Sequence, residues 1–94
     1  MSEIRVCREH GVTLKRARQG AERIAEELGE EFGLDHEWDG NTLRFQRMGV
    51  SGHIEVGKKE VEICVKLGFL LAALRPRIEH EINRFCDENF GPAS

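Results

Sequence analysis

A thiol and an imidazole lie close together near the start of the chain, in the segment Cys7-Arg8-Glu9-His10. A catalytic cysteine needs a base that converts its thiol to the nucleophilic thiolate, and this is the nearest such pair along the sequence. His10 also precedes a predicted helix, where its side chain could organise the backbone before Leu14 by hydrogen bonding. We favour this structural role, and a cysteine- and histidine-dependent enzyme remains a minor hypothesis.

The other side chains that could bind a metal are spread along the chain without the spacing of a metal site. A structural zinc ion needs four converging ligands, and the sequence holds no Cys-x-x-Cys or His-x-x-x-His pair. We therefore predict no metal site and no cofactor. The scattered residues are His36, His53, Cys64, His80 and Cys86.

Other catalytic and nucleic-acid motifs lack a required element. The chain has no Gly-x-Ser-x-Gly elbow, and carboxylate pairs such as Glu26-Glu27 fall on a helix face that we expect to be solvated. Gly49-Val50-Ser51-Gly52 matches the Gly-x-x-Gly loop of KH domains, but that loop joins two helices and this segment lies between predicted strands. We expect no catalytic centre, no enzyme activity and no nucleic-acid binding.

The apolar run from residue 69 to residue 74 is the strongest candidate for a binding surface. If helical, it is apolar around nearly its whole circumference, which is more than one buried face can use. Phe69, Leu70, Leu71 and Leu74 could form a dimer contact or a docking patch, or the segment could thread through the core. Trp38, the sole tryptophan, presents a similar choice between a lid on the core and an anchor for a ligand.

A basic segment opens the first predicted helix. Lys15, Arg16 and Arg18 lie at its start, whereas glutamates gather towards its end. This order opposes the helix dipole, which favours anions at the N-terminus and cations at the C-terminus. Either the arrangement is accidental, or the basic end meets an anionic or protein partner.

Hydrophobic periodicity predicts two amphipathic helices. Apolar residues recur at three- and four-residue steps over 13–32, and Gly33 offers the left-handed conformation that commonly closes a helix. A second helical pattern spans 69–89 and is interrupted by Pro76. Either Pro76 starts a helix that follows a separate turn, or it kinks one longer helix at 75–76.

Period-two alternation and turn residues predict five strands, at 3–7, 35–38, 42–48, 52–57 and 60–67. Asp39-Gly40-Asn41 and Gly57-Lys58-Lys59 supply turns between antiparallel neighbours. The simplest way to bury the apolar faces of both predicted helices is to pack them on one face of an antiparallel meander sheet. We predict a single two-layer α+β domain over residues 1–94, in the order β-α-β-β-β-β-α. One sheet face is expected to meet water, through residues that include Arg44, Glu55, Glu62 and Lys66.

Composition favours a small soluble domain. Of the 94 residues, 39% are hydrophobic and 33% are charged, which argues against disorder, and a chain this short makes a homodimer plausible. The longest apolar run is far shorter than the roughly 20 residues that span a bilayer, and no secretory signal is visible. The three cysteines do not have the spacing of a disulfide framework, so we expect a cytoplasmic protein with reduced thiols. The net charge of -3 predicts no general attraction to nucleic acid.

Several short segments are more specific in their order and spacing than any single motif. They are His10 before the first helix, Leu14, Ala17 and Ala21 within it, and the runs 38–45, 49–54 and 67–71. In this pattern, which covers nearly the full chain, the protein resembles the polyhydroxyalkanoic acid system protein family of short bacterial proteins. The resemblance implies a role near the storage-polyester granule, alongside the polymerase and the granule-coating phasins. It implies no reaction and carries over no catalytic residues.

Three functional hypotheses follow. The leading one is a non-enzymatic accessory protein of the polyhydroxyalkanoate system, with granule proteins such as phasin or polymerase, or the polyester surface itself, as partner of the apolar run. The alternative is a protein that holds a small acyl or other apolar ligand between sheet and helices. The minor one is the enzyme acting through Cys7 and His10.

Overall fold

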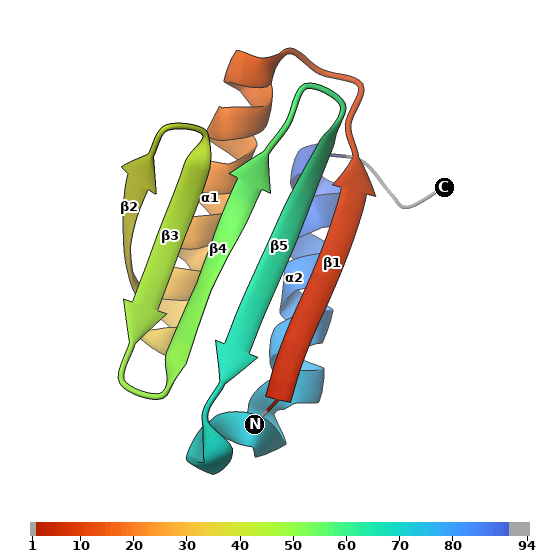
Figure 1. The fold of residues 1–94 in the computed structure, drawn as a ribbon. Helices are drawn as coiled ribbons and strands as arrows, with labels where there is room; N and C mark the ends of the chain where they lie inside the picture. Colours follow the sequence, from red (N-terminus) through yellow and green to blue (C-terminus); the bar gives the residue numbers. More distant parts are fainter. Residues whose placement is uncertain (1, 91–94) are drawn as a thin grey trace.

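Alternating apolar and polar residues build a sheet in the computed structural model, which describes residues 2–90 and, within them, all side chains except those of Ser2 and Leu70. Its strands run antiparallel to their neighbours in the spatial order β1-β5-β4-β3-β2 (Figure 1). They are β1 (Ser2–Glu9), β2 (Asp35–Asp39), β3 (Thr42–Arg47), β4 (Val50–Val56) and β5 (Glu60–Leu67). β2 to β5 form a meander, and β1 completes the sheet by pairing with β5.

The predicted α+β class and the element order are confirmed, and both helices lie on one face of the sheet (Figure 1). Helix α1 (Leu14–Phe32) connects β1 at one sheet edge to β2 at the other. Thr13 caps its start by accepting a 3.2 Å hydrogen bond from the Arg16 amide. Gly33 ends it in the left-handed conformation, with φ of 71°, as the sequence predicts.

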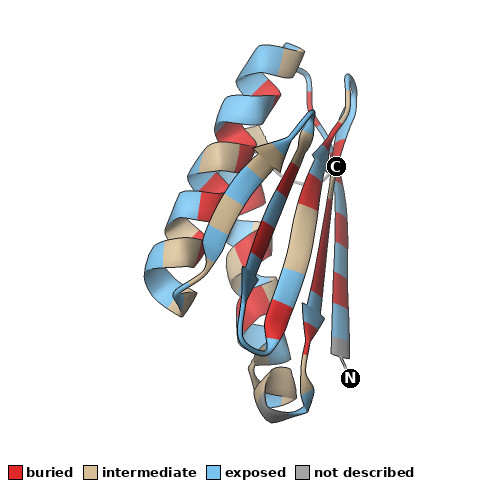
Figure 2. Ribbon diagram, turned by 60° about the vertical axis from the view of Figure 1, so that its left-hand side comes forward, coloured by how far each residue is buried: buried red, intermediate tan, exposed pale blue. Residues whose placement is uncertain are grey.

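The core fills the layer between sheet and helices, where the buried bands of strands and helices face one another in Figure 2. Ile24 of α1, Ile54 of β4 and Ile63 of β5 are each 0% exposed and belong to one continuous cluster. Burial of a side chain of this size stabilises the fold by about 1.5–3 kcal/mol. The outer face of the sheet carries the charged residues that we expected to meet water.

Several strand bounds differ from the predicted ones. The sequence predicts a strand that ends at residue 7, whereas β1 extends to Glu9. Arg8 is buried on the core face, and a charged residue at a buried position interrupts the alternation of apolar and polar residues on which the prediction depends. β4 begins at Val50 instead of residue 52, and β3 ends at Arg47, because Gly49 takes a left-handed φ of 86° and makes the turn between them.

The C-terminal segment is divided in two at Arg75. Residues Phe69–Leu74 form a 3₁₀ helix, η1, and α2 (Arg75–Phe90) follows it. Pro76 lies in the first turn of α2, where its missing N–H would have no helical partner in any case. Of the two arrangements left open by the sequence, the structure therefore has the one in which proline opens a separate helix.

Candidate functional site

Two apolar side chains project into solvent at one end of the sheet. Phe69, the first residue of η1, is 86% exposed, and Met48, in the β3–β4 turn, is 93% exposed. The Gly68 amide donates a 2.7 Å hydrogen bond to the Gly49 carbonyl, so the two segments that carry these side chains are joined directly. Figure 1 shows η1 and the β3–β4 turn at the same end of the molecule.

The remaining residues of the predicted patch are less exposed. Leu71 and Leu74 are half-buried and pack against the core, and Leu71 also lies against Gly49. The side chain of Leu70 lies outside the described part of the chain. We call Met48, Phe69, Leu71 and Leu74 the apolar end. Sequence reasoning missed Met48, whose position in a turn after Arg47 carries no periodic signal.

Trp38 lies on edge strand β2, and its side chain contacts α1. Its indole Nε1 donates a 2.6 Å hydrogen bond to Glu22 Oε2, and His36 Nε2 lies 3.2 Å from the other oxygen of the same carboxylate. Arg18 Cζ lies 4.5 Å from the centroid of the indole ring, at the distance of a cation–π contact. Glu22 thus ties the edge strand to the helix, whereas the sequence pattern groups it only with the glutamates that gather towards the end of the helix.

A groove of about 440 Å³ opens beside this tryptophan, lined by Leu14, Lys15, Arg18, Gln19, Glu22 and Trp38. Two candidates that the sequence treated separately, the tryptophan and the basic helix start, therefore share one surface. Arg16 does not join them, because it lines a different hollow next to Asn89 of α2. The groove combines an apolar floor with two cations.

The imidazole of His10 is engaged in backbone hydrogen bonds. Its Nδ1 accepts a 3.4 Å bond from the Val12 amide, which leaves Nε2 to donate a 2.8 Å bond to the Gly57 carbonyl. The ring is 7% exposed, and it orders the chain just before α1. This arrangement agrees with the helix-entry role that the sequence suggests.

The thiol of Cys7 faces the outer side of the sheet. It lies 3.5 Å from Glu60 Oε2, and slight desolvation at the sheet surface together with this hydrogen bond raises the pKa of the exposed thiol. A raised pKa reduces the thiolate population on which nucleophilic catalysis depends. The environment of Cys7 is therefore the opposite of the one an activated cysteine requires.

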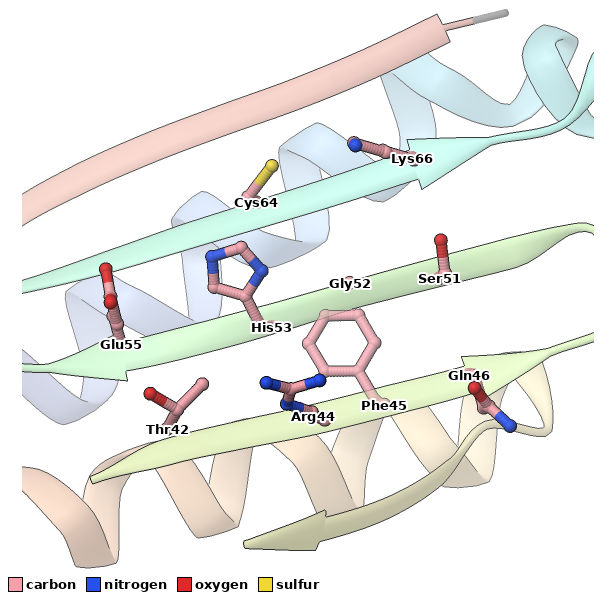
Figure 3. Close-up of a pocket in the computed structure, with 10 residues that line it drawn as sticks. All are labelled: Thr42, Arg44, Phe45, Gln46, Ser51, Gly52, His53, Glu55, Cys64 and Lys66. Atoms are coloured by element: carbon pink, nitrogen blue, oxygen red, sulfur yellow. The ribbon is translucent and has the colours of Figure 1, made fainter. Parts of the chain in front are cut away.

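The outer sheet face holds a shallow polar hollow of about 430 Å³, shown in Figure 3. His53 and Glu55 project into it from β4, with Arg44 on one side and Cys64 on the other (Figure 3). One ligand atom from each of His53, Glu55 and Glu62 lies within 4.8 Å of the others. The sequence placed both glutamates on the wet face but did not connect them with His53.

The remaining candidate groups lie elsewhere, except for Cys64, which is the directly opposite partner of His53 on β5. His36 binds Glu22, His80 is exposed on α2, and Cys64 and Cys86 are buried free thiols. In the Gly-x-x-Gly segment, Gly49 forms a turn and Gly52 lies within β4. This context supports the sheet role of the glycines that the sequence suggests.

The protein is a small two-layer α+β domain with three distinctive surfaces. They are the apolar end, the groove beside Trp38, and the polar hollow with His53 and Glu55 on the outer face of the sheet. Residues 4–90 match a family model described as "Putative polyhydroxyalkanoic acid system protein", and the chain belongs to this family. The family's name associates the protein with the polyhydroxyalkanoate system. No curated protein and no solved structure shows significant similarity to the chain.

Membrane insertion through a helix has no support in residues 2–90. Neither α1 nor α2 combines the length and the apolar character that a membrane-spanning helix needs.

Proposed function

We propose that the protein is a non-enzymatic accessory protein of the polyhydroxyalkanoate system, which docks through its apolar end onto the surface of the polyester granule in the cytoplasm. The observation that carries the proposal is the joint exposure of Phe69 and Met48, held together by the hydrogen bond between Gly68 and Gly49. Paired exposed large apolar side chains at one tip of a small domain are typical of an interaction surface.

The size of the apolar end suits weak and reversible binding. Burying a Phe or Met side chain contributes about 1.5–3 kcal/mol, so the two together contribute about 3–6 kcal/mol before the costs of association. Taken alone, this corresponds to affinities from millimolar to tens of micromolar. A protein that binds on this scale can exchange between a granule surface and the surrounding solution.

The surroundings of Cys7 and His10, the pair that the sequence singled out, support a non-enzymatic role. Cys7 has a raised pKa next to Glu60, and both ring nitrogens of His10 are used by the backbone. A base whose proton and lone pair are both engaged is poorly placed to activate a thiol. The enzyme hypothesis can be tested directly. A Cys7→Ala/His10→Ala double variant should lose any activity that depends on this thiol and imidazole.

Co-sedimentation with purified polyester granules tests the docking proposal. We expect a Phe69→Asp/Met48→Asp variant to lose at least tenfold in granule affinity, because a charge replaces each contacting side chain. Phe69→Leu should retain most of the binding. Asn41→Asp is a suitable control, because this exposed residue lies in the β2–β3 turn at the other end of the sheet.

Size-exclusion chromatography of the same variants distinguishes a granule contact from a contact between two copies of the chain. Unchanged granule binding by a folded Phe69→Asp/Met48→Asp variant would overturn the proposal. If that variant instead dissociates a dimer and still binds granules, the apolar end is a homodimer interface.

A second candidate function is the binding of a small apolar acid in the groove beside Trp38. The interior is occupied by core side chains, so the acyl ligand of the alternative hypothesis needs a surface site, and this groove has a mainly apolar lining that the polar hollow on the outer sheet face lacks. Trp38 and Leu14 offer an apolar floor, and Lys15 and Arg18 offer charge to a carboxylate.

Tryptophan fluorescence tests this candidate, since Trp38 is the sole tryptophan. A medium-chain 3-hydroxyalkanoate should change its emission saturably, and the methyl ester of the same acid should bind at least fivefold more weakly. Lys15→Gln should weaken the acid similarly, whereas Arg16→Gln, outside the groove, should not. The candidate fails if acid and ester behave alike.

A further inference from the structure

Two carboxylates face each other across the centre of the outer sheet face. Glu55 of β4 and Glu62 of β5 are directly opposite partners in the antiparallel register. Like charges in directly opposed positions destabilise a sheet. The pair lies on two interior strands of the sheet, where neither strand can move away without breaking pairing on its other side.

The cations of this face do not neutralise the pair. Neither Glu55 nor Glu62 has an ion-pair partner among residues 2–90. Arg5 pairs with Glu3 at 3.0 Å, and Arg44 pairs with Asp39 at 3.7 Å. Glu60 is a further carboxylate on β5, and it accepts the hydrogen bond from the thiol of Cys7. Within residues 2–90 the centre of the face therefore carries two opposed carboxylates without an ion pair. Arg5, whose guanidinium pKa is raised most by its hydrogen bond to Glu3, interacts with Glu62 only through a longer-range attraction that adds to this rise.

His53 completes a set of metal-ligand types beside this pair. It precedes Glu55 by two residues on β4 and therefore projects from the same face of the sheet, as Figure 3 shows. Its imidazole nitrogen and one oxygen from each glutamate lie within 4.8 Å of one another. Donors around a tetrahedral ion at 2.0–2.1 Å lie about 3.3–3.4 Å apart, so ion binding has to draw these atoms together by at most about 1.5 Å.

We propose that His53, Glu55 and Glu62 form a binding site for a divalent cation, with Zn²⁺ the ion best suited to one imidazole and two carboxylates. The cation neutralises the opposed carboxylates and crosslinks β4 to β5. Glu55 is exposed, so the site is accessible to ions from solvent. This site is separate from the apolar end, and the metal-binding proposal does not depend on granule docking.

Thermal unfolding of the metal-free protein, titrated with Zn²⁺ alone, tests the site. We expect Zn²⁺ to raise the unfolding midpoint at concentrations where Mg²⁺ has no effect, because Mg²⁺ disfavours imidazole. Glu62→Gln and His53→Gln should each weaken the Zn²⁺ response at least tenfold. Glu37→Gln, a neutralised carboxylate on the outer face of edge strand β2, is the matched control and should respond as the wild type does.

A second measurement, made without metal, tests the repulsion between the two glutamates directly. In EDTA, Glu62→Gln should unfold at a higher temperature than the wild type, since it removes the repulsion with Glu55. Wild type that shows no Zn²⁺ response would overturn the proposal, as would a full response in Glu62→Gln. Loss of the response in Cys7→Ser with full retention in His53→Gln would place zinc at Cys7 and Glu60 and would also overturn it.

Discussion

The ring of Phe45 occupies the space beside Gly52, its directly opposite partner on β4. A Cβ atom at Gly52 would lie 2.7 Å from Phe45 Cε2 and 2.5 Å from the carbonyl oxygen of Cys64. The absence of a side chain at this position thus lets a large aromatic ring pack into the core over a central strand. Aromatic rings commonly compensate for glycine in strands in this way.

Replacing this glycine should therefore disrupt the centre of the sheet. We expect Gly52→Ala to lower the free energy of unfolding by about 2–3 kcal/mol, because the close backbone oxygen cannot move without displacing β5. Denaturant unfolding measures the change. Gly11→Ala is the control, since nothing lies within 4 Å of a Cβ there, and it should stay within about 0.5 kcal/mol of wild type. Equal stability of both variants would contradict this account.

The N-terminus of α1 can be improved by one substitution. Thr13 caps the helix, but position N3 holds Arg16, and the first turn contains no acidic residue. Arg16→Glu creates a capping box and reverses an unfavourable interaction with the helix dipole, so it should raise stability by about 0.5–1 kcal/mol. Thr13→Ala should lower it by about 1 kcal/mol. Thermal unfolding at low salt checks both, and a destabilising Arg16→Glu would show that Arg16 makes a contact that outweighs the helix dipole.

Cys86 should make the protein less stable at alkaline pH. Its side chain is 0% exposed, and burial raises the pKa of the thiol from 9.0 to about 11. Between these values the unfolded chain releases the proton while the folded chain retains it, so stability falls as pH rises from 9 to 11. The loss approaches about 2–3 kcal/mol at the upper end.

The dependence on this thiol can be isolated by comparison with Cys86→Ala. The variant should be less stable than wild type at pH 7 because of the cavity, but its unfolding free energy should decline less between pH 9 and 11. Parallel pH profiles for the two proteins would contradict the assignment. Cys86 should also react with a thiol reagent much more slowly than the exposed Cys7.

Arg8 holds α2 against β1 through a partly buried ion pair. Its guanidinium donates to Asp87 at 2.6 Å and to the side chain of Asn83 at 3.0 Å. Asp87→Ala should cost about 1–3 kcal/mol, because it removes a charged acceptor from a buried cation. Arg8→Met should cost less than Asp87→Ala, since an apolar side chain of similar length needs no acceptor. Denaturant unfolding of both variants checks the order, and the reverse order would contradict it.

The sequence predicted the fold well wherever a pattern repeats over several residues. The apolar positions of α1, Thr13 as part of its start and Gly33 as its end were all visible, because helix periodicity and capping depend on nearby residues. β1 was predicted too short because buried Arg8 is satisfied by Asp87, a partner in the last helix. An ion pair between distant segments leaves no local signal.

The candidate sites were only partly visible for the same reason. Phe69 was predicted as part of the apolar run 69–74 and Trp38 as the sole tryptophan, but Glu22 became significant only when α1 was placed beside β2. Glu55 and Glu62 could have been paired from the sequence by counting outward from the Gly57-Lys58-Lys59 turn, since a hairpin's register follows from its loop. The link between Met48 and η1 depends on the Gly68–Gly49 hydrogen bond, which sequence patterns do not encode.

The position of β1 also bears on the order in which the chain assembles. The β2–β5 meander joins neighbours along the chain, whereas Ser2 pairs with Leu67 across most of the sequence. Contacts between distant segments form late, because closing a long loop costs entropy before it yields any contact. We therefore expect β1 to be the last of the five strands to join the sheet. Until β1 pairs, the edge of β5 is open to the first strand of a second chain, so we expect strand exchange between copies to be the main misfolding risk of this architecture.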